Sequence, residues 1–140
     1  MQNLSPILTE QYLEKADHFL QGMRRLSDNS GAYRSGVGLL AVHSAISLND
    51  AIIAGVRGSR TKAEDHSTAV SELGRICAEF RVEANPGVQH FSYLVSRKTG
   101  IAYGNERISD ADLKLTTDKA ERFANLAYTH FKEVLGVRRS

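Results

Sequence analysis

The chain has 140 residues, of which 41% are hydrophobic and 24% are charged, and its 18 Lys and Arg against 16 Asp and Glu leave a net charge of +2. These values exclude a disordered chain, a fibrous repeat and a protein that holds nucleic acid mainly by a strongly basic surface. The single cysteine, Cys77, excludes an internal disulfide and a multi-cysteine metal site. We expect one domain over residues 1–140, with its core at about 9–136.

The first predicted helix begins at Thr9, whose hydroxyl is typical of an N-cap. Apolar residues then recur every three or four positions as far as Leu26, which is the spacing of one helix face. The polar segment 27–31 ends this pattern. The sequence opens with polar and acidic residues, so we expect no secretory signal and a cytoplasmic protein.

Residues 35–56 form a mostly apolar run whose only ionisable side chains are His43 and Asp50. The run predicts a central buried helix that starts within 30–34 and stops within 55–59. Although the run is long enough to span a membrane, Asp50 would cost about 2.5 to 3.5 kcal/mol near a bilayer centre, so we expect no membrane span. His43 and Asp50 are seven residues apart and share a helix face, which indicates a site or a polar pair.

Further along the chain, a capping-box spacing at 61–64 precedes a third apolar stripe that includes Cys77. On this stripe Cys77 is more typical of a core residue than of a nucleophile. Asn85 and Pro86 predict the cap and first position of a short fourth helix. Residues 97–108 contain two glycines and several basic side chains without a sustained period, which predicts a loop or a broken turn.

The last predicted helix begins at Ser109, which has a box-like spacing to Asp112, and it ends at Gly136. Together the helical segments and the lack of strand patterns predict an all-α, up-and-down bundle of four to five helices.

Three short motifs carry a resemblance to a known family. They are VHSAISLNDAI at 42–52, the pair Asp65-His66, and RKTGIAY at 97–103. With the long final helix, they resemble the HEPN family of small helical-bundle proteins over roughly residues 10 to 135. The resemblance implies a homodimer, and either a metal-independent ribonuclease of bacterial toxin, antitoxin or defence systems or a binding module without catalysis.

The family's nuclease motif places a His four to six residues after an Arg, near the start of the last long helix. Here Arg97 matches the Arg, but Tyr103 stands where the His would fall. Arginine can hold a scissile phosphate, whereas tyrosine titrates near 10 and is a poor proton acceptor at neutral pH. Lys98 and Arg107 are further candidates for phosphate binding, although an ordinary solvated basic loop has the same composition.

Another histidine could replace the missing base. If the second and third helices form an antiparallel hairpin, Asp50 faces His66, and a carboxylate would raise the pKa of that imidazole and fix its tautomer. A structural polar pair between helices explains the same residues. A metal site at His43, Asp50, Asp65 and His66 lacks any local ligand spacing, so no metal or cofactor is expected.

Two functions follow from the sequence. The first is a non-catalytic HEPN-like module that binds RNA, a nucleotide or a protein partner near Arg97 and Tyr103. The second is a metal-independent endoribonuclease in which Arg97 and Tyr103 contact the phosphate and His43 or His66 is the base, with Asp50 as its partner.

Overall fold

In the computed structural model, the described residues, 3–28, 32–59, 66–104 and 107–136, contain helices and no strand. The helices are α1 (Pro6–Ser27), α2 (Arg34–Arg57), α3 (His66–Glu79), α4 (Gly87–Ser96), α5 (Lys98–Tyr103), α6 (Asp110–His130) and α7 (Lys132–Leu135). The all-α bundle predicted from the sequence is confirmed, with five longer helices and two short ones.

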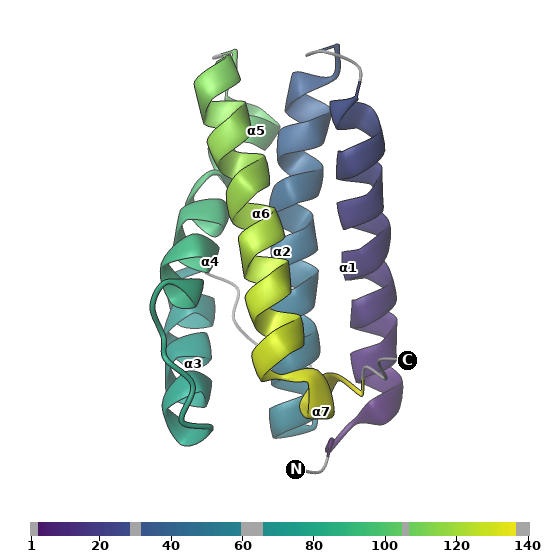
Figure 1. Cartoon of the computed structure of the whole chain (residues 1–140), viewed down its shortest axis with the longest axis vertical. Helices are drawn as coiled ribbons and strands as arrows, with labels where there is room; N and C mark the ends of the chain where they lie inside the picture. The colour runs from purple at the N-terminus through teal and green to yellow at the C-terminus, as the bar shows by residue number, and fades with distance from the viewer. Residues whose placement is uncertain (1–2, 29–31, 60–65, 105–106, 137–140) are drawn as a thin grey trace.

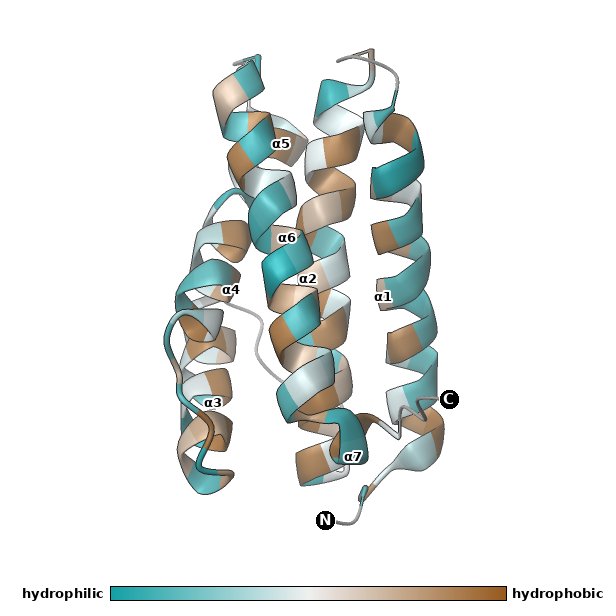
Figure 2. Cartoon of the chain, in the orientation of Figure 1, coloured by the Kyte–Doolittle hydropathy of each residue, from teal (hydrophilic) through white to brown (hydrophobic). Residues whose placement is uncertain are grey.

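Helix α2 lies at the centre of the bundle and contacts every other helix of the described chain (Figure 1). Small residues on several of its faces let neighbouring helices approach closely; Ala41, Ala51 and Ala54 are fully buried. Hydrophilic residues cover the outward faces of α1 and α6 (Figure 2). The predicted central helix is therefore confirmed, and its Gly58 ends it in the left-handed conformation with φ 77°.

Two predicted helix starts are wrong by a few residues. Ser5 rather than Thr9 is the N-cap of α1, because Pro6 takes the first helical position; Thr9 is buried and donates a hydrogen bond to the Ser5 carbonyl at 2.8 Å. Pro86 occupies the N-cap of α4, where its carbonyl accepts the His90 amide at 2.9 Å, and the helix begins one residue later. The capping box predicted at 61–64 lies outside the described residues.

The start of α6 agrees with the sequence. The Ser109 hydroxyl accepts a hydrogen bond from the Asp112 amide at 3.1 Å, as the capping spacing predicts. At its other end, α6 stops at His130, and the short α7 continues to Gly136, whose φ is 71°. The predicted last helix is therefore interrupted once before the glycine that ends it.

The third helix runs in the same direction as α2, so the two do not form the antiparallel hairpin considered above (Figure 1). Arg57, the last residue of α2, pairs with Glu72 at 2.7 Å and with Glu79, at the C-terminal end of α3, at 2.6 Å. In an antiparallel hairpin Glu79 would lie at the far end of α3 from Arg57. These ion pairs therefore fix the parallel direction of the two helices.

By length and composition, α2 is the one described helix that could cross a membrane, and 72% of its most apolar window is buried inside the bundle. Burial of this kind is what a core helix of a soluble protein has. The structure thus agrees with the expectation that this run packs against other helices.

Candidate functional site

The segment after Arg97, predicted as a loop, instead forms helix α5 over Lys98–Tyr103. Its Ile101 packs on Gly38 of α2: a Cβ on that glycine would lie 3.3 Å from Ile101 Cδ1 and 3.3 Å from Ile108 Cδ1. The close approach at Gly38 lets α5 dock on the central helix. The loop prediction failed because glycine and the short length weaken the local helix signal, whereas tertiary packing supports the turn.

Arg97 lies at the junction of α4 and α5 and is half-buried. Its Nη2 atom lies 3.8 Å from Oδ2 of Asp112 in the first turn of α6, which is a long contact for an ion pair. Its Nε is buried and has no hydrogen-bond partner within the described part of the chain. The guanidinium is thus held at the start of α6 with donors to spare.

Lys98 and His43, from segments far apart in the sequence, interact through charge. The pKa of His43 is lowered by burial and, to a smaller extent, by the positive charge of Lys98. The ring also packs near Phe19 of α1, with centroids 5.7 Å apart. His43 is therefore a neutral imidazole at pH 7, with a cation from α5 in its neighbourhood.

The remaining basic and aromatic candidates are open to solvent. Tyr103 at the end of α5 is 81% exposed, and Arg107 is also exposed. Neither makes a hydrogen bond or ion pair with another described residue. Within the described part of the chain, the tyrosine hydroxyl and the guanidinium therefore have no partner.

Asp50 and His66 are not placed in one site by the described contacts. Asp50 is partly buried on α2, two turns beyond His43. His66 begins α3, but its side chain lies outside the described residues, as does Asp65. The pairing of Asp50 with His66 stays a prediction. It was argued from an antiparallel hairpin of the second and third helices, which the structure does not have.

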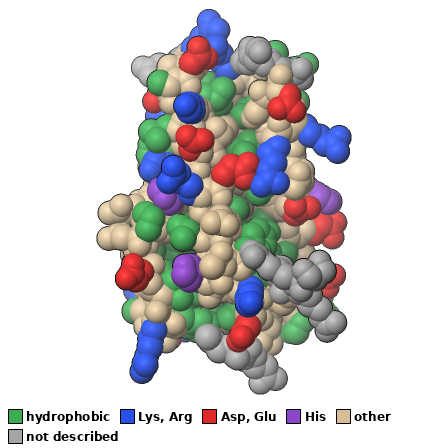
Figure 3. Space-filling model, viewed as in Figure 1, with side chains coloured by type: hydrophobic (Ala, Val, Ile, Leu, Met, Phe, Trp, Pro, Cys, Tyr) green, Lys and Arg blue, Asp and Glu red, His purple; other side chains and the backbone are tan. Residues whose placement is uncertain are grey.

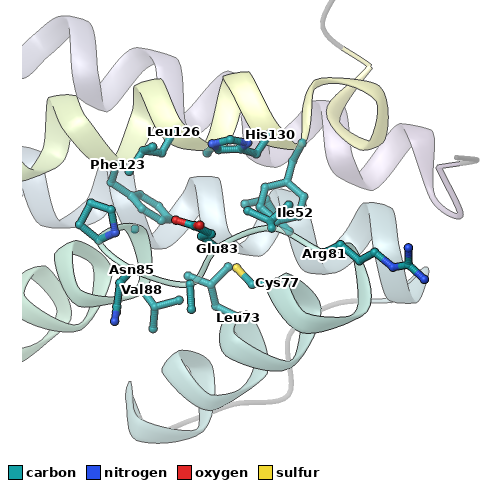
Figure 4. A pocket seen from close by; sticks show the side chains of 16 residues that line it. Ile52, Leu73, Cys77, Arg81, Glu83, Asn85, Val88, Phe123, Leu126 and His130 are labelled. Carbon is teal, nitrogen blue, oxygen red and sulfur yellow. The ribbon is translucent and has the colours of Figure 1, made fainter.

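A cavity with a volume of about 280 Å³ lies elsewhere, between α3, α6 and the segment 81–88 (Figure 4). Its walls are mainly apolar side chains from four segments, among them Ile52, Leu73, Cys77, Val88, Phe123 and Phe131. None of the residues proposed from the sequence as catalytic or phosphate-binding lines it. The sequence signal for this cavity is weak, since its walls belong to ordinary core stripes.

Cys77 in this cavity has the properties of a core residue, as its position on the apolar stripe predicts. The side chain is buried, and burial raises the pKa of its thiol above the usual value. A raised pKa keeps the thiol protonated and a poor nucleophile at neutral pH. Among the described residues, no group of three or more His, Cys, Asp or Glu side chains is placed to hold a metal ion.

On the face shown in Figure 3, basic and acidic side chains alternate with apolar ones, so this face carries no broad patch of one charge. A charged ligand on this face would therefore meet individual side chains rather than a patch of one charge.

No protein-family model matches the chain, and no curated protein is significantly similar to it.

Proposed function

We propose that this chain is a HEPN-like helical-bundle module of a bacterial stress or defence system, cytoplasmic and homodimeric, that binds RNA or a nucleotide through its phosphates. The proposed site lies where α4, α5 and α6 meet and uses Arg97, Lys98 and Arg107, with Tyr103 at its edge. The observation that carries the proposal is that Arg97 and Lys98 follow one another where α4 and α5 meet, and that the Arg97 guanidinium makes only a long, half-exposed contact with Asp112. The charge of Lys98 also acts on His43. Two neighbouring cations are suited to one phosphate.

Binding rather than cleavage is the first choice because Tyr103 stands where the family motif has its histidine. A phenol is a poor base at pH 7, although it can donate a hydrogen bond to a phosphate oxygen. The half-buried Lys98 and the partly paired Arg97 are positioned for recognition without a proton transfer.

One observation favours the second candidate, a metal-independent endoribonuclease. His43 is kept neutral by burial and by Lys98, and a neutral imidazole can accept the proton of a ribose 2′-hydroxyl. In that reaction Arg97 would hold the scissile phosphate, and Tyr103 would donate a hydrogen bond to it.

RNA cleavage and RNA binding, measured together in EDTA, separate the two functions. Wild type, Arg97→Ala, Lys98→Ala and His43→Gln are compared, with Lys15→Ala as the control because Lys15 is an exposed lysine on α1. A binding module binds without cleaving, and its affinity falls in Arg97→Ala and Lys98→Ala but not in Lys15→Ala. Cleavage by wild type that disappears in both Arg97→Ala and His43→Gln would establish the ribonuclease instead.

Thermal unfolding with added nucleotides gives an independent measurement of binding. A ligand at 100 times its Kd raises the free energy of unfolding by about 2.7 kcal/mol. Failure of RNA and nucleotides alike to bind or to stabilise the wild type would refute the proposed phosphate site.

A further inference from the structure

A second basic cluster lies on the seam between α4 and α6. Nζ of Lys119 lies 3.4 Å from Nδ1 of His90 and 5.2 Å from the centre of the Tyr93 ring. Because an ammonium has only donors, the imidazole accepts at Nδ1 in its neutral form. An acceptor and an aromatic face therefore hold the ammonium in position.

Within the described part of the chain, Lys119 makes no ion pair with a carboxylate. The pKa of His90 is lowered by burial, then by the positive charges of Lys119 and Arg122. The charges of Lys119 and Arg122 thus both act on one nearly buried imidazole.

The cluster lies on the same seam as Arg97. The contact between Arg97 and Asp112 and the contact between His90 and Lys119 are separated by seven residues on each of the two antiparallel helices (Figure 1). Seven residues of helix rise about 10 Å. Two cations therefore lie along the seam, about two helical turns apart. One is Arg97, whose contact with Asp112 is long, and the other is Lys119, which has no carboxylate partner among the described residues.

We propose that a single strand of RNA lies along the α4/α6 seam, with one phosphate at Arg97 and Lys98 and another at Lys119 and Arg122. This inference rests on the proposed function, and it names the form of the nucleic acid and its path. Cations fixed in place before binding lose little side-chain entropy when they meet a phosphate. Repeated phosphates of one strand suit two separate cationic positions, whereas a single nucleotide phosphate would occupy only one of them.

The test measures the affinity of a labelled single-stranded RNA of about ten nucleotides as a function of salt concentration. Wild type, Lys119→Ala with Arg122→Ala, Lys98→Ala and the control Lys15→Ala are compared. Each neutralised phosphate contributes about −0.7 to the slope of log Kobs against log salt for a single strand. We expect the double variant to bind more weakly and to have a shallower slope, by about 0.7 for each phosphate that it no longer neutralises.

A second measurement uses the wild type alone, so it does not depend on whether the double variant folds. The NMR titration of His90 is followed with and without the same RNA. A phosphate beside Lys119 would offset the nearby positive charge, so the RNA should raise the pKa of His90 toward its ordinary value.

The outcomes separate this inference from the function on which it rests. Binding that depends on Lys98, together with an unchanged slope in the double variant and an unmoved His90, overturns the seam and leaves the proposed site standing. Absence of RNA binding by wild type overturns both. Equal competition by a polyglutamate peptide would show that the seam recognises an acidic protein segment, and would also overturn the inference.

Discussion

The Nη2 atom of Arg97, at the end of α4, lies 3.8 Å from Oδ2 of Asp112 in the first turn of α6. The contact joins two helices across the place where α5 begins, and it leaves the Nε of Arg97 buried without a partner among the described residues. The carboxylate of Asp112 therefore partly neutralises the arginine that the proposed function assigns to a phosphate. A phosphate bound as proposed would compete with this carboxylate for one guanidinium.

This competition predicts that Asp112→Asn increases the affinity for RNA. The long, half-exposed contact has the geometry of a surface ion pair, which is worth about 0.2 to 1 kcal/mol, so the gain is up to about fivefold. Fluorescence anisotropy with labelled RNA measures it. Glu10→Gln, at an exposed position on α1, removes the same charge outside the α4/α6 seam and should change the affinity less. Equal gains in the two variants would indicate an effect of net charge alone.

Gly55 and Gly74 form a matched pair for a test of packing. A Cβ on Gly55 would lie 2.5 Å from Cγ1 and 3.0 Å from the carbonyl oxygen of Val134, whereas a Cβ on Gly74 meets nothing within 4 Å. Gly55→Ala should lower the free energy of unfolding by about 1 to 3 kcal/mol, because α7 must move. Gly74→Ala should raise it by up to about 1 kcal/mol through helix propensity. Urea denaturation of both variants measures the difference, and a stabilised Gly55→Ala would contradict the close packing of α7 on α2.

The two histidines with lowered pKa values predict that stability falls on mild acidification. His43 and His90 both have pKa values below the unfolded value of about 6.5. As the pH falls through that value, the unfolded chain takes up protons before the folded one, so the free energy of unfolding decreases. Above about pH 7 both states hold neutral imidazoles, and this pH dependence vanishes.

Urea denaturation between about pH 7.5 and pH 5 measures this effect. His43→Gln and His90→Gln should each flatten the dependence, and His18→Gln serves as the control on an exposed position of α1. A profile that stays the same in both His43→Gln and His90→Gln would show that other groups cause it.

The ion pairs of Arg57 predict a salt-sensitive link between α2 and α3. Its guanidinium donates to Glu72 at 2.7 Å and to Glu79 at 2.6 and 3.0 Å. Arg57→Gln should destabilise the protein more than Arg75→Gln. Among the described residues, Arg75 bonds only to Glu72, and its side chain is more exposed than that of Arg57. The difference should shrink in about 1 M salt, where the Debye length is about 3 Å. Thermal unfolding at low and high salt measures it, and equal effects of the two variants at low salt would argue against the parallel packing of α3.

Much of the fold follows from local patterns in the sequence. The central helix with Gly58 at its end, the break after Ser27 and the cap at Ser109 are set by apolar spacing and backbone chemistry within a few residues. Such features need no distant partner, so they can be predicted. The start of α1 was missed because the apolar spacing was taken to begin after Thr9, whereas Ser5 and Pro6 form the first turn.

The candidate site depended less on local pattern. The sequence alone determined that the chain is all-helical and that the helix carrying His43 is buried. Arg97 and Tyr103 as site residues came from a family resemblance and stay a prediction. Only the tertiary structure decided that α5 is a helix, since Ile101 docks at Gly38, and that Lys98 lies near His43. It also decided that Lys119 rests against His90 and that α3 runs parallel to α2. The physical reason is that these relations join residues distant in the chain, and their energies come from packing and charge between helices, which no local periodicity encodes.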